Sequence, residues 1–218
     1  MKSFAVIGCG RFGTAVAKTL YQLGNEVLAI DQDMDVVESV SRFVTHAIQA
    51  DVMDEETLAE LGLRNFDVVI VSIGTDLQAS IMATLIVKEL GVKKVVAKAQ
   101  SELHGKVLKK IGADKVVFPE RDMGVRVGHN LTSNSIVDYI ELSPDYSILE
   151  IEAIPKWFNK SLAELRLRNK YGINVMAIKK RDKIDVSPHP DYKIDPADVL
   201  VAIGSTDDIN RIEEEAGD

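Results

Sequence analysis

Three glycines and one aspartate near the start of the chain have the types and spacing of a phosphate- and ribose-binding site. Gly8, Gly10 and Gly13 form a G-x-G-x-x-G motif between an apolar run and a helical pattern. Such glycines permit a tight turn, a close approach of backbone to phosphate and close helix–strand packing, beside the free N–H groups of a helix N-terminus. Asp31 ends the next apolar run, where a carboxylate binds ribose hydroxyls and repels a 2′-phosphate. The sequence therefore predicts a bound adenine nucleotide.

Two side chains in this motif, Arg11 and Phe12, stand at the start of the predicted helix and belong to the predicted nucleotide site. A guanidinium there adds a full positive charge and a bidentate donor to the helix dipole. Such a group suits the terminal phosphate of a triphosphate better than the internal pyrophosphate of a dinucleotide. The alternative is a solvated arginine on the first helical turn.

Glu120, in the segment FPERD, is the acidic counterpart of Arg11. A carboxylate near a polyphosphate is repulsive unless a cation bridges the two, so Glu120 is a candidate metal ligand. The alternative is a helix N-terminal acid that interacts favourably with the dipole.

Residues that would support catalysis are missing from the sequence. No tyrosine is followed four residues later by lysine, and the four histidines (His46, His104, His129 and His189) are scattered and are interpreted as surface or capping residues. No metal cluster, nucleophile elbow or P-loop is recognisable. We therefore expect a binding protein and not an enzyme. A NAD(H)-binding redox sensor and a NAD-dependent oxidoreductase remain the alternatives.

Composition excludes several other classes of protein. The net charge of −8 argues against nucleic acid as a partner, and the basic run at 179–183 is short and interrupted. The single cysteine, Cys9, excludes a disulfide framework and is interpreted as a small apolar filler in the glycine loop. The chain enters its first strand by Ser3, and no apolar run reaches the roughly 18–20 residues that span a bilayer. We expect a cytoplasmic protein.

Six short apolar runs alternate with amphipathic helical segments over the first two-thirds of the chain, which predicts βαβ units and a parallel sheet covered on both faces. With the glycine motif after the first strand, the expected fold is Rossmann-like and doubly wound, in the order 3-2-1-4-5-6. Asp51, after the third strand, is expected at an adenine amine or as an N-cap, and Gly74 with Thr75, after the fourth, beside the phosphates. The predicted strands are 4–8, 26–30, 45–49, 67–73, 94–99 and 115–118, and the helices between them are 11–23, 33–42, 54–61, 76–90 and 102–111.

The last third of the chain has a different pattern and predicts a small α+β domain. A helix at about 120–133 leads into residues 133–147, which read as a connection because small polar residues surround a Ser-Pro pair. Residues 149–154 alternate like a half-solvated strand, and one capped helix is expected from Ser161 to Gly172. A domain of this size has a marginal core, so self-association is expected. The predicted domains are 1–134 and 135–218, with further strands at 173–179, about 183–186 and 198–203, and a last helix from Thr206.

Beyond these single motifs, a series of segments runs through the chain in an order typical of one family. They are FAVIGCGRFG, HAIQAD, LRNFDVVIVSIG, QAS, VKKVVAKAQ, HGKVLKKIGAD, FPERDMG, VDYIELSPDYSILE and RNKYGINVMAIK. The chain resembles the Ktr/Trk potassium-uptake regulatory subunits, which are cytosolic RCK proteins made of an RCK-N and an RCK-C lobe. The resemblance covers essentially all 218 residues.

The resemblance implies an assembly and a mode of regulation. Proteins of this family form dimers that assemble into an octameric ring, which docks under a Ktr-type membrane potassium transporter at the inner face of the cell membrane. ATP in the RCK-N lobes favours the active state, and ADP favours the inactive state.

By position, the resemblance also implies roles for individual residues. Arg11 contacts the γ-phosphate, including that of the neighbouring subunit, and Glu120 binds an activating cation, divalent or monovalent, with Mg²⁺ expected. Lys98, in VAKAQ, is implied as a further pocket residue. Cys9 stands where the family commonly has leucine.

In the RCK-C lobe the resemblance implies a site for cyclic di-AMP, an inhibitory ligand, at the dimer interface. Arg168 would meet a phosphate and Asn174 a phosphate or base, while the apolar residues would pack on an adenine; alternatively, Arg168 is a solvated helix arginine and Leu162 a core residue. Ala163 replaces a larger aliphatic residue that is often found in the family. The implied residues are Leu162, Ala163, Arg168, Asn174, Pro188 and Pro190.

Overall fold

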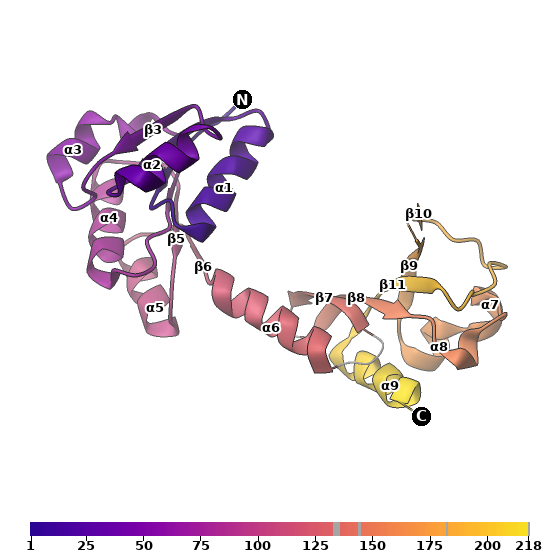
Figure 1. Ribbon diagram of the computed structural model, residues 1–218. Helices are drawn as coiled ribbons and strands as arrows, with labels where there is room; N and C mark the ends of the chain where they lie inside the picture. Colours follow the sequence, from indigo (N-terminus) through magenta and orange to yellow (C-terminus); the bar gives the residue numbers. More distant parts are fainter. Residues whose placement is uncertain (133–135, 144, 182, 218) are drawn as a thin grey trace. The chain divides into compact units, whose positions relative to one another are not determined.

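The computed structural model describes residues 1–132, 136–143, 145–181 and 183–217, which form two compact units, Met1–Arg121 and Asp122–Asp218 (Figure 1). The division falls within one helix, α6 (Pro119–Thr132). The sequence groups that whole helix with the first domain, and a boundary between 134 and 135 stays a prediction because residues 133–135 lie outside the described part of the chain.

The first unit contains the predicted Rossmann-like sheet. All six strands pair in parallel in the order β3-β2-β1-β4-β5-β6, which confirms the doubly wound order expected from the position of the glycine motif. The strands are β1 (Ser3–Ile7), β2 (Glu26–Asp31), β3 (His46–Gln49), β4 (Val68–Val71), β5 (Val95–Lys98) and β6 (Lys115–Val117).

Helices cover both faces of this sheet because its central strands are apolar on both sides (Figure 1). α1 (Arg11–Gln22) and α2 (Met34–Ser41) pack on one face through Ala17 and Val40. The opposite face is covered by α3 (Glu55–Glu60), α4 (Leu77–Glu89) and α5 (Glu102–Lys110), and a 3-10 helix, η1 (Leu63–Asn65), follows α3.

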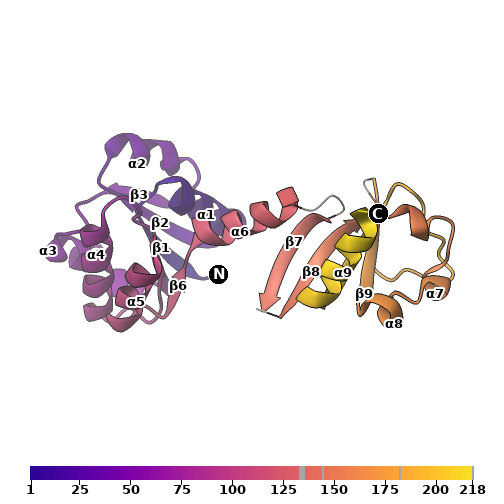
Figure 2. The same ribbon diagram turned by 90° about the horizontal axis from the view of Figure 1, so that it is seen from below.

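The second unit is an antiparallel five-stranded sheet in the order β10-β9-β11-β8-β7, with helices against one face. Figure 2 shows α9 (Thr206–Gly217) lying along this sheet. Leu149, Ile151 and Leu200 project from neighbouring strands into the core under the helices. The remaining elements are β7 (Ile136–Ser143), β8 (Tyr146–Glu152), η2 (Pro155–Trp157), α7 (Leu162–Leu165), α8 (Leu167–Tyr171), β9 (Asn174–Lys180), β10 (Lys183–Asp185) and β11 (Asp198–Ser205).

The prediction that residues 133–147 are a connection is wrong, because Ile136–Ser143 forms strand β7. β7 is an edge strand paired with β8 alone, and its register shifts twice along the pairing. The shifts break the two-residue alternation, so that Val137 and Ile140, three residues apart, are both exposed while Tyr139 is buried. Because buried and exposed residues do not alternate regularly, the sequence pattern does not predict this strand.

The single helix predicted from Ser161 to Gly172 is also wrong at its middle. Arg166 adopts a left-handed backbone with φ of 45°, which ends α7 and separates it from α8. The predicted ends are confirmed: Ser161 forms a capping box with Glu164, and Gly172 closes α8 with φ of 74°.

No helix in the described part of the chain is both long enough and apolar enough to cross a bilayer.

Candidate functional site

The glycine loop between β1 and α1 has the backbone geometry that phosphate binding requires. Gly8 has a φ of +86°, where a side chain would be strained. A Cβ on Gly13 would overlap the carbonyl oxygen of Gly8 and Oγ of Ser72, and the Ser72 hydroxyl donates a hydrogen bond to that carbonyl. The Thr14 hydroxyl donates to the carbonyl of Cys9 at 2.6 Å. These contacts hold the loop tightly against β4 and α1.

The N-terminus of α1 is open and uncapped by side chains. Gly10 is the N-cap residue, and a Cβ added to it would meet nothing within 4 Å. The first turn of α1 carries no acidic residue and begins with the exposed Arg11. The helix dipole and the guanidinium therefore act together on an anion at this position.

Asp31, at the end of β2, links the glycine loop to the following turn. Its Oδ2 accepts the Cys9 N–H at 2.6 Å, and its Oδ1 accepts the Asp33 N–H at 3.0 Å. Each carboxylate oxygen has two lone pairs, so the same group keeps acceptor capacity for ribose hydroxyls. Asp31 both shapes the loop and faces the cavity.

A cavity of about 450 Å³ lies at this edge of the sheet, at the carboxyl ends of the strands. Nine of the residues predicted from sequence line it: Gly8, Gly10, Arg11, Phe12, Asp31, Gly74, Thr75, Lys98 and Glu120. The sequence prediction missed the other lining residues, which are Gln32, Asp33, Val36, Val52, Ser72, Ile73, Asp76 and Ala79.

Two predicted residues lie outside the lining. Gly13 sits behind the loop, where it allows the close packing already described. The exposed Asp51 accepts the Met53 N–H at 2.9 Å, while Asp54 is the N-cap of α3. Its neighbour Val52 is the residue of this turn that reaches the cavity.

Lys98 and Glu120 form an ion pair in the cavity wall. Lys98, at the end of β5, is only 9% exposed, and its Nζ donates to Oε1 of Glu120. The hydrogen bond from Lys98 lowers the pKa of Glu120, which is therefore ionised at neutral pH. Lys98 Nζ also lies 5.9 Å from the centroid of the Phe12 ring.

Cys9 is buried in the core beneath the loop at 3% exposure. Burial and the nearby Asp31 charge raise the pKa of its thiol to about 12, so the reactive thiolate is disfavoured. The structure supports the interpretation of Cys9 as an apolar filler.

A second cavity, also about 450 Å³, lies in the second unit between β9, the α7–α8 segment and the loop that follows β10. All six residues implied for cyclic di-AMP line it: Leu162, Ala163, Arg168, Asn174, Pro188 and Pro190. Arg166, Leu167, Asn169, Ile173 and Val175 complete the lining and were not predicted. The left-handed turn at Arg166 places two arginines at this cavity, which a continuous helix pattern does not reveal.

Outside these cavities, the described residues hold no group of three or more His, Cys, Asp or Glu side chains that would bind a metal. Of the two interpretations of His104, as a surface or as a capping residue, the surface interpretation is wrong, because the residue is 3% exposed. Its Nδ1 accepts the Gln100 N–H at 3.3 Å, and burial lowers the pKa of the imidazole. His104 is a neutral core residue whose side chain accepts a backbone N–H at the start of α5.

The fold is that of a protein with two lobes, a Rossmann-like first lobe and an α+β second lobe. Comparisons with known proteins show which family has this combination. The TrkA-N domain family matches residues 4–119, and the TrkA-C domain family matches residues 147–217. Ktr system potassium uptake protein C of Bacillus subtilis (strain 168) is 50% identical over 97% of this chain and 96% of the relative. Ktr system potassium uptake protein A of the same organism is 45% identical over 98% of this chain and 96% of the relative. The chain belongs to the family of Ktr system potassium uptake proteins, which are non-enzymatic RCK proteins.

A solved structure with the same fold is the RCK domain of GsuK. It superposes with a TM-score of 0.71 at 17% identity, over 100% of this chain and 48% of that chain. The GsuK channel has also been solved bound to NAD. The RCK C domain of a KtrA protein, solved in complex with cyclic diadenosine monophosphate, is 37% identical over 32% of this chain and 82% of that chain, with a TM-score of 0.31.

Proposed function

We propose that this chain is the regulatory subunit of a Ktr-type potassium uptake system, with ATP and ADP as the ligands of its first unit. The observation that carries the proposal is the set of charged groups at the uncapped N-terminus of α1: Arg11, Lys98 and Glu120 line one cavity with the glycine loop. Asp31 in the same lining is suited to the ribose.

The two positive side chains favour a nucleoside polyphosphate over NAD(H), which stays the alternative ligand. Arg11 and Lys98 supply two full charges beside the helix dipole. A terminal phosphate carries more negative charge than the internal pyrophosphate of a dinucleotide, and a guanidinium binds it with two hydrogen bonds. ATP has one phosphate more than ADP, so these groups discriminate between the two nucleotides. Such differential affinity is what allows a ligand to shift a conformational equilibrium.

A cation at Glu120 fits this arrangement only together with a nucleotide. Glu120 supplies one carboxylate to the cavity, and the described residues offer no further cluster of acidic or histidine ligands around it. Hard cations such as Mg²⁺ commonly combine one or two carboxylates with substrate phosphates. We propose that Glu120 holds such a cation beside the terminal phosphate.

The partners follow from family membership. We propose that the chain self-associates into dimers and an octameric ring, and that this ring contacts a Ktr membrane subunit from the cytoplasmic side. The two named Bacillus subtilis relatives belong to Ktr potassium uptake systems, and this chain matches nearly their whole length.

For the second cavity we propose cyclic di-AMP as an inhibitory ligand. Arg166 and Arg168 offer two guanidinium groups for its phosphates, and Asn174 offers an amide for phosphate or base. Leu162, together with the two prolines of the lining, provides apolar surface for an adenine ring.

Thermal unfolding with added ligands tests both assignments. We expect ATP and ADP, each at about 100 times its dissociation constant, to stabilise the protein by about 2.7 kcal/mol. Mg²⁺ should add to the effect of ATP and not to that of ADP. Arg11→Gln should reduce stabilisation by ATP more than by ADP, and Arg168→Gln should reduce only the effect of cyclic di-AMP. Arg42→Gln is the matched control, because Arg42 is an exposed arginine at the end of α2 outside both cavities.

Stabilisation by NADH alone would contradict the ATP and ADP assignment and favour the redox alternative. No response to cyclic di-AMP at any concentration would contradict the assignment of the second cavity without affecting the first.

A further inference from the structure

The ion pair between Lys98 and Glu120 joins a nearly buried positive charge to a largely exposed negative one. Lys98 reaches the cavity from the end of β5, and Glu120 reaches it from the first turn of α6. The lysine side chain is 11% exposed and the glutamate side chain is 67% exposed. A nearly buried ammonium needs a partner, whereas the exposed carboxylate is still able to reach solvent or a cation.

The Lys98 ammonium lies beside two other residues of the cavity lining, Gly74 and Phe12. A Cβ on Gly74 would lie 3.1 Å from Lys98 Nζ, and the centroid of the Phe12 ring lies 5.9 Å from the same nitrogen. Both Gly74 and Phe12 line the cavity, and Phe12 is in the first turn of α1. The ammonium therefore lies close both to the carboxylate and to the first turn of α1, where the helix dipole attracts an anion.

Phosphate in this cavity and an ionised Glu120 repel each other unless a positive charge stands beside them. In the ion pair that charge is Lys98, the partner of Glu120; with a cation bound, it is the cation. A carboxylate oxygen that already accepts from an ammonium is a poorer cation ligand, because the two positive charges compete for it and repel each other.

We propose that Lys98 is an internal counter-ion for Glu120, which competes with the cation for this carboxylate and makes the cation dispensable when ADP is bound. This proposal rests on the proposed nucleotide function. In it, Lys98 positions the Glu120 carboxylate and neutralises its charge. The extra phosphate of ATP attracts the ammonium more strongly and leaves Glu120 to the cation. Cation dependence then accompanies ATP and not ADP.

A double-mutant cycle measured by titration calorimetry of ADP tests this role, in EDTA with tetramethylammonium as the sole added cation. Lys98→Met keeps the length of the side chain without its charge. With Glu120 present, we expect it to weaken ADP binding by about tenfold or more, because the carboxylate is left uncompensated. In the Glu120→Gln background the same change should weaken binding by less than about threefold. Added Mg²⁺ should recover most of the loss in Lys98→Met alone.

Two further variants separate the possible causes. Lys98→Arg keeps the charge and should bind ADP within about threefold of the unsubstituted protein. Arg11→Gln, the matched control, should cost the same with Glu120 or Gln at position 120, because Arg11 lies in α1 and, among the described contacts, the ion-pair partner of Glu120 is Lys98. Circular dichroism of each variant confirms that it is folded before titration.

An equal loss from Lys98→Met in both backgrounds would overturn the proposal and make Lys98 a phosphate ligand alone. Failure of the unsubstituted protein to bind either ATP or ADP would instead overturn the proposed function.

Discussion

At the scale of single residues, the glycines of the loop have different tasks that the structure separates. Gly13 is packed against β4 and the loop itself, where a methyl group would overlap two oxygen atoms. Gly10 faces open space, and its φ of −63° is accessible to any residue. Gly13 is therefore required for packing, whereas no contact within the protein requires a glycine at position 10.

Gly13→Ala and Gly10→Ala should differ accordingly. We expect Gly13→Ala to lower the free energy of unfolding by about 1–3 kcal/mol, since overpacking forces the loop away from Ser72. Gly10→Ala should change stability by less than about 0.5 kcal/mol and still weaken nucleotide binding, because the proposed function requires phosphate to approach the Gly10 backbone at the cavity wall. Urea denaturation and nucleotide titration measure the two effects. Equal stability losses in both variants would contradict this division of roles.

Sequence reasoning located most of the first cavity because parallel strands place their carboxyl ends at one edge, where glycine and acidic residues then gather. The same rule also points to Ser72 and Ile73, which immediately precede Gly74, but their apolar or small side chains carry no chemical signal. Asp51 lies outside the lining, and its carboxylate accepts the Met53 N–H in a local turn.

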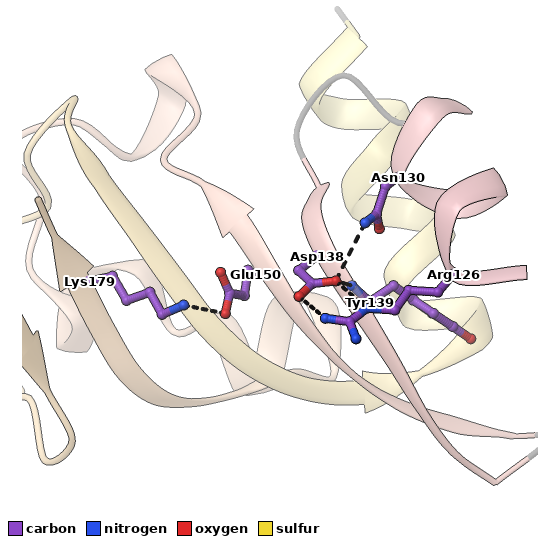
Figure 3. A network of polar contacts seen from close by, with 6 residues as sticks. All are labelled: Arg126, Asn130, Asp138, Tyr139, Glu150 and Lys179. Carbon is purple, nitrogen blue, oxygen red and sulfur yellow. Dashed lines mark hydrogen bonds and ion pairs between the residues drawn. The ribbon is translucent and has the colours of Figure 1, made fainter. Parts of the chain in front are cut away.

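At the scale of elements, a polar network fixes helix α6 to strand β7 within the second unit (Figure 3). Arg126 donates two hydrogen bonds to the two carboxylate oxygens of Asp138, one of them from Nε at 2.7 Å. The Asn130 amide and the Tyr139 N–H also donate to Asp138 Oδ1. In Figure 3 a second pair, Lys179 of β9 with Glu150 of β8, reaches across β11, the strand between them.

Hydrogen bonds from Arg126 hold the pKa of Asp138 well below its usual range, so this network makes stability depend on pH. Its contribution is fully present above the unfolded-state pKa of about 3.9 and is lost as the pH falls toward the folded-state value. We expect Asp138→Asn to lower stability by about 1 kcal/mol at pH 7, a modest value because both side chains are partly exposed. The difference between the two proteins should shrink below about pH 4.

Denaturation curves at several pH values measure this difference. In an Arg126→Met background, Asp138→Asn should cost far less and show a weaker pH dependence. The same cost with and without Arg126 would show that the ion pair does not fix α6 to β7.

The strands and helices of the first unit could be predicted because short apolar runs and amphipathic segments alternate regularly there. The second unit was predicted less completely. β7 has register shifts that interrupt the alternation of buried and exposed residues. The left-handed residue Arg166 divides the segment into two helices, although Ser161 and Gly172 are typical capping residues for one continuous helix. A positive φ at arginine has no sequence signal, since non-glycine residues rarely adopt it.

At the scale of the whole molecule, each compact unit has its own apolar core and its own cavity. Trp157 and Ile151 belong to the core of the second unit, whereas Ile7 and Val71 belong to that of the first. All residues that line the first cavity come from Met1–Arg121, and all that line the second come from Asp122–Asp218. A ligand of either cavity is therefore expected to stabilise one unit directly.

Scanning calorimetry of the nucleotide-free protein should accordingly show two unfolding transitions. ADP at about 100 times its dissociation constant should raise the transition of the first unit by an amount equivalent to about 2.7 kcal/mol, and cyclic di-AMP should do the same for the other transition. The variants assign the transitions independently of the ligands, because Gly13→Ala should lower the one that ADP raises and Asp138→Asn should lower the other. A single transition that both ligands raise equally would show instead that the two units unfold as one cooperative structure, in which stabilisation at either cavity reaches the whole chain.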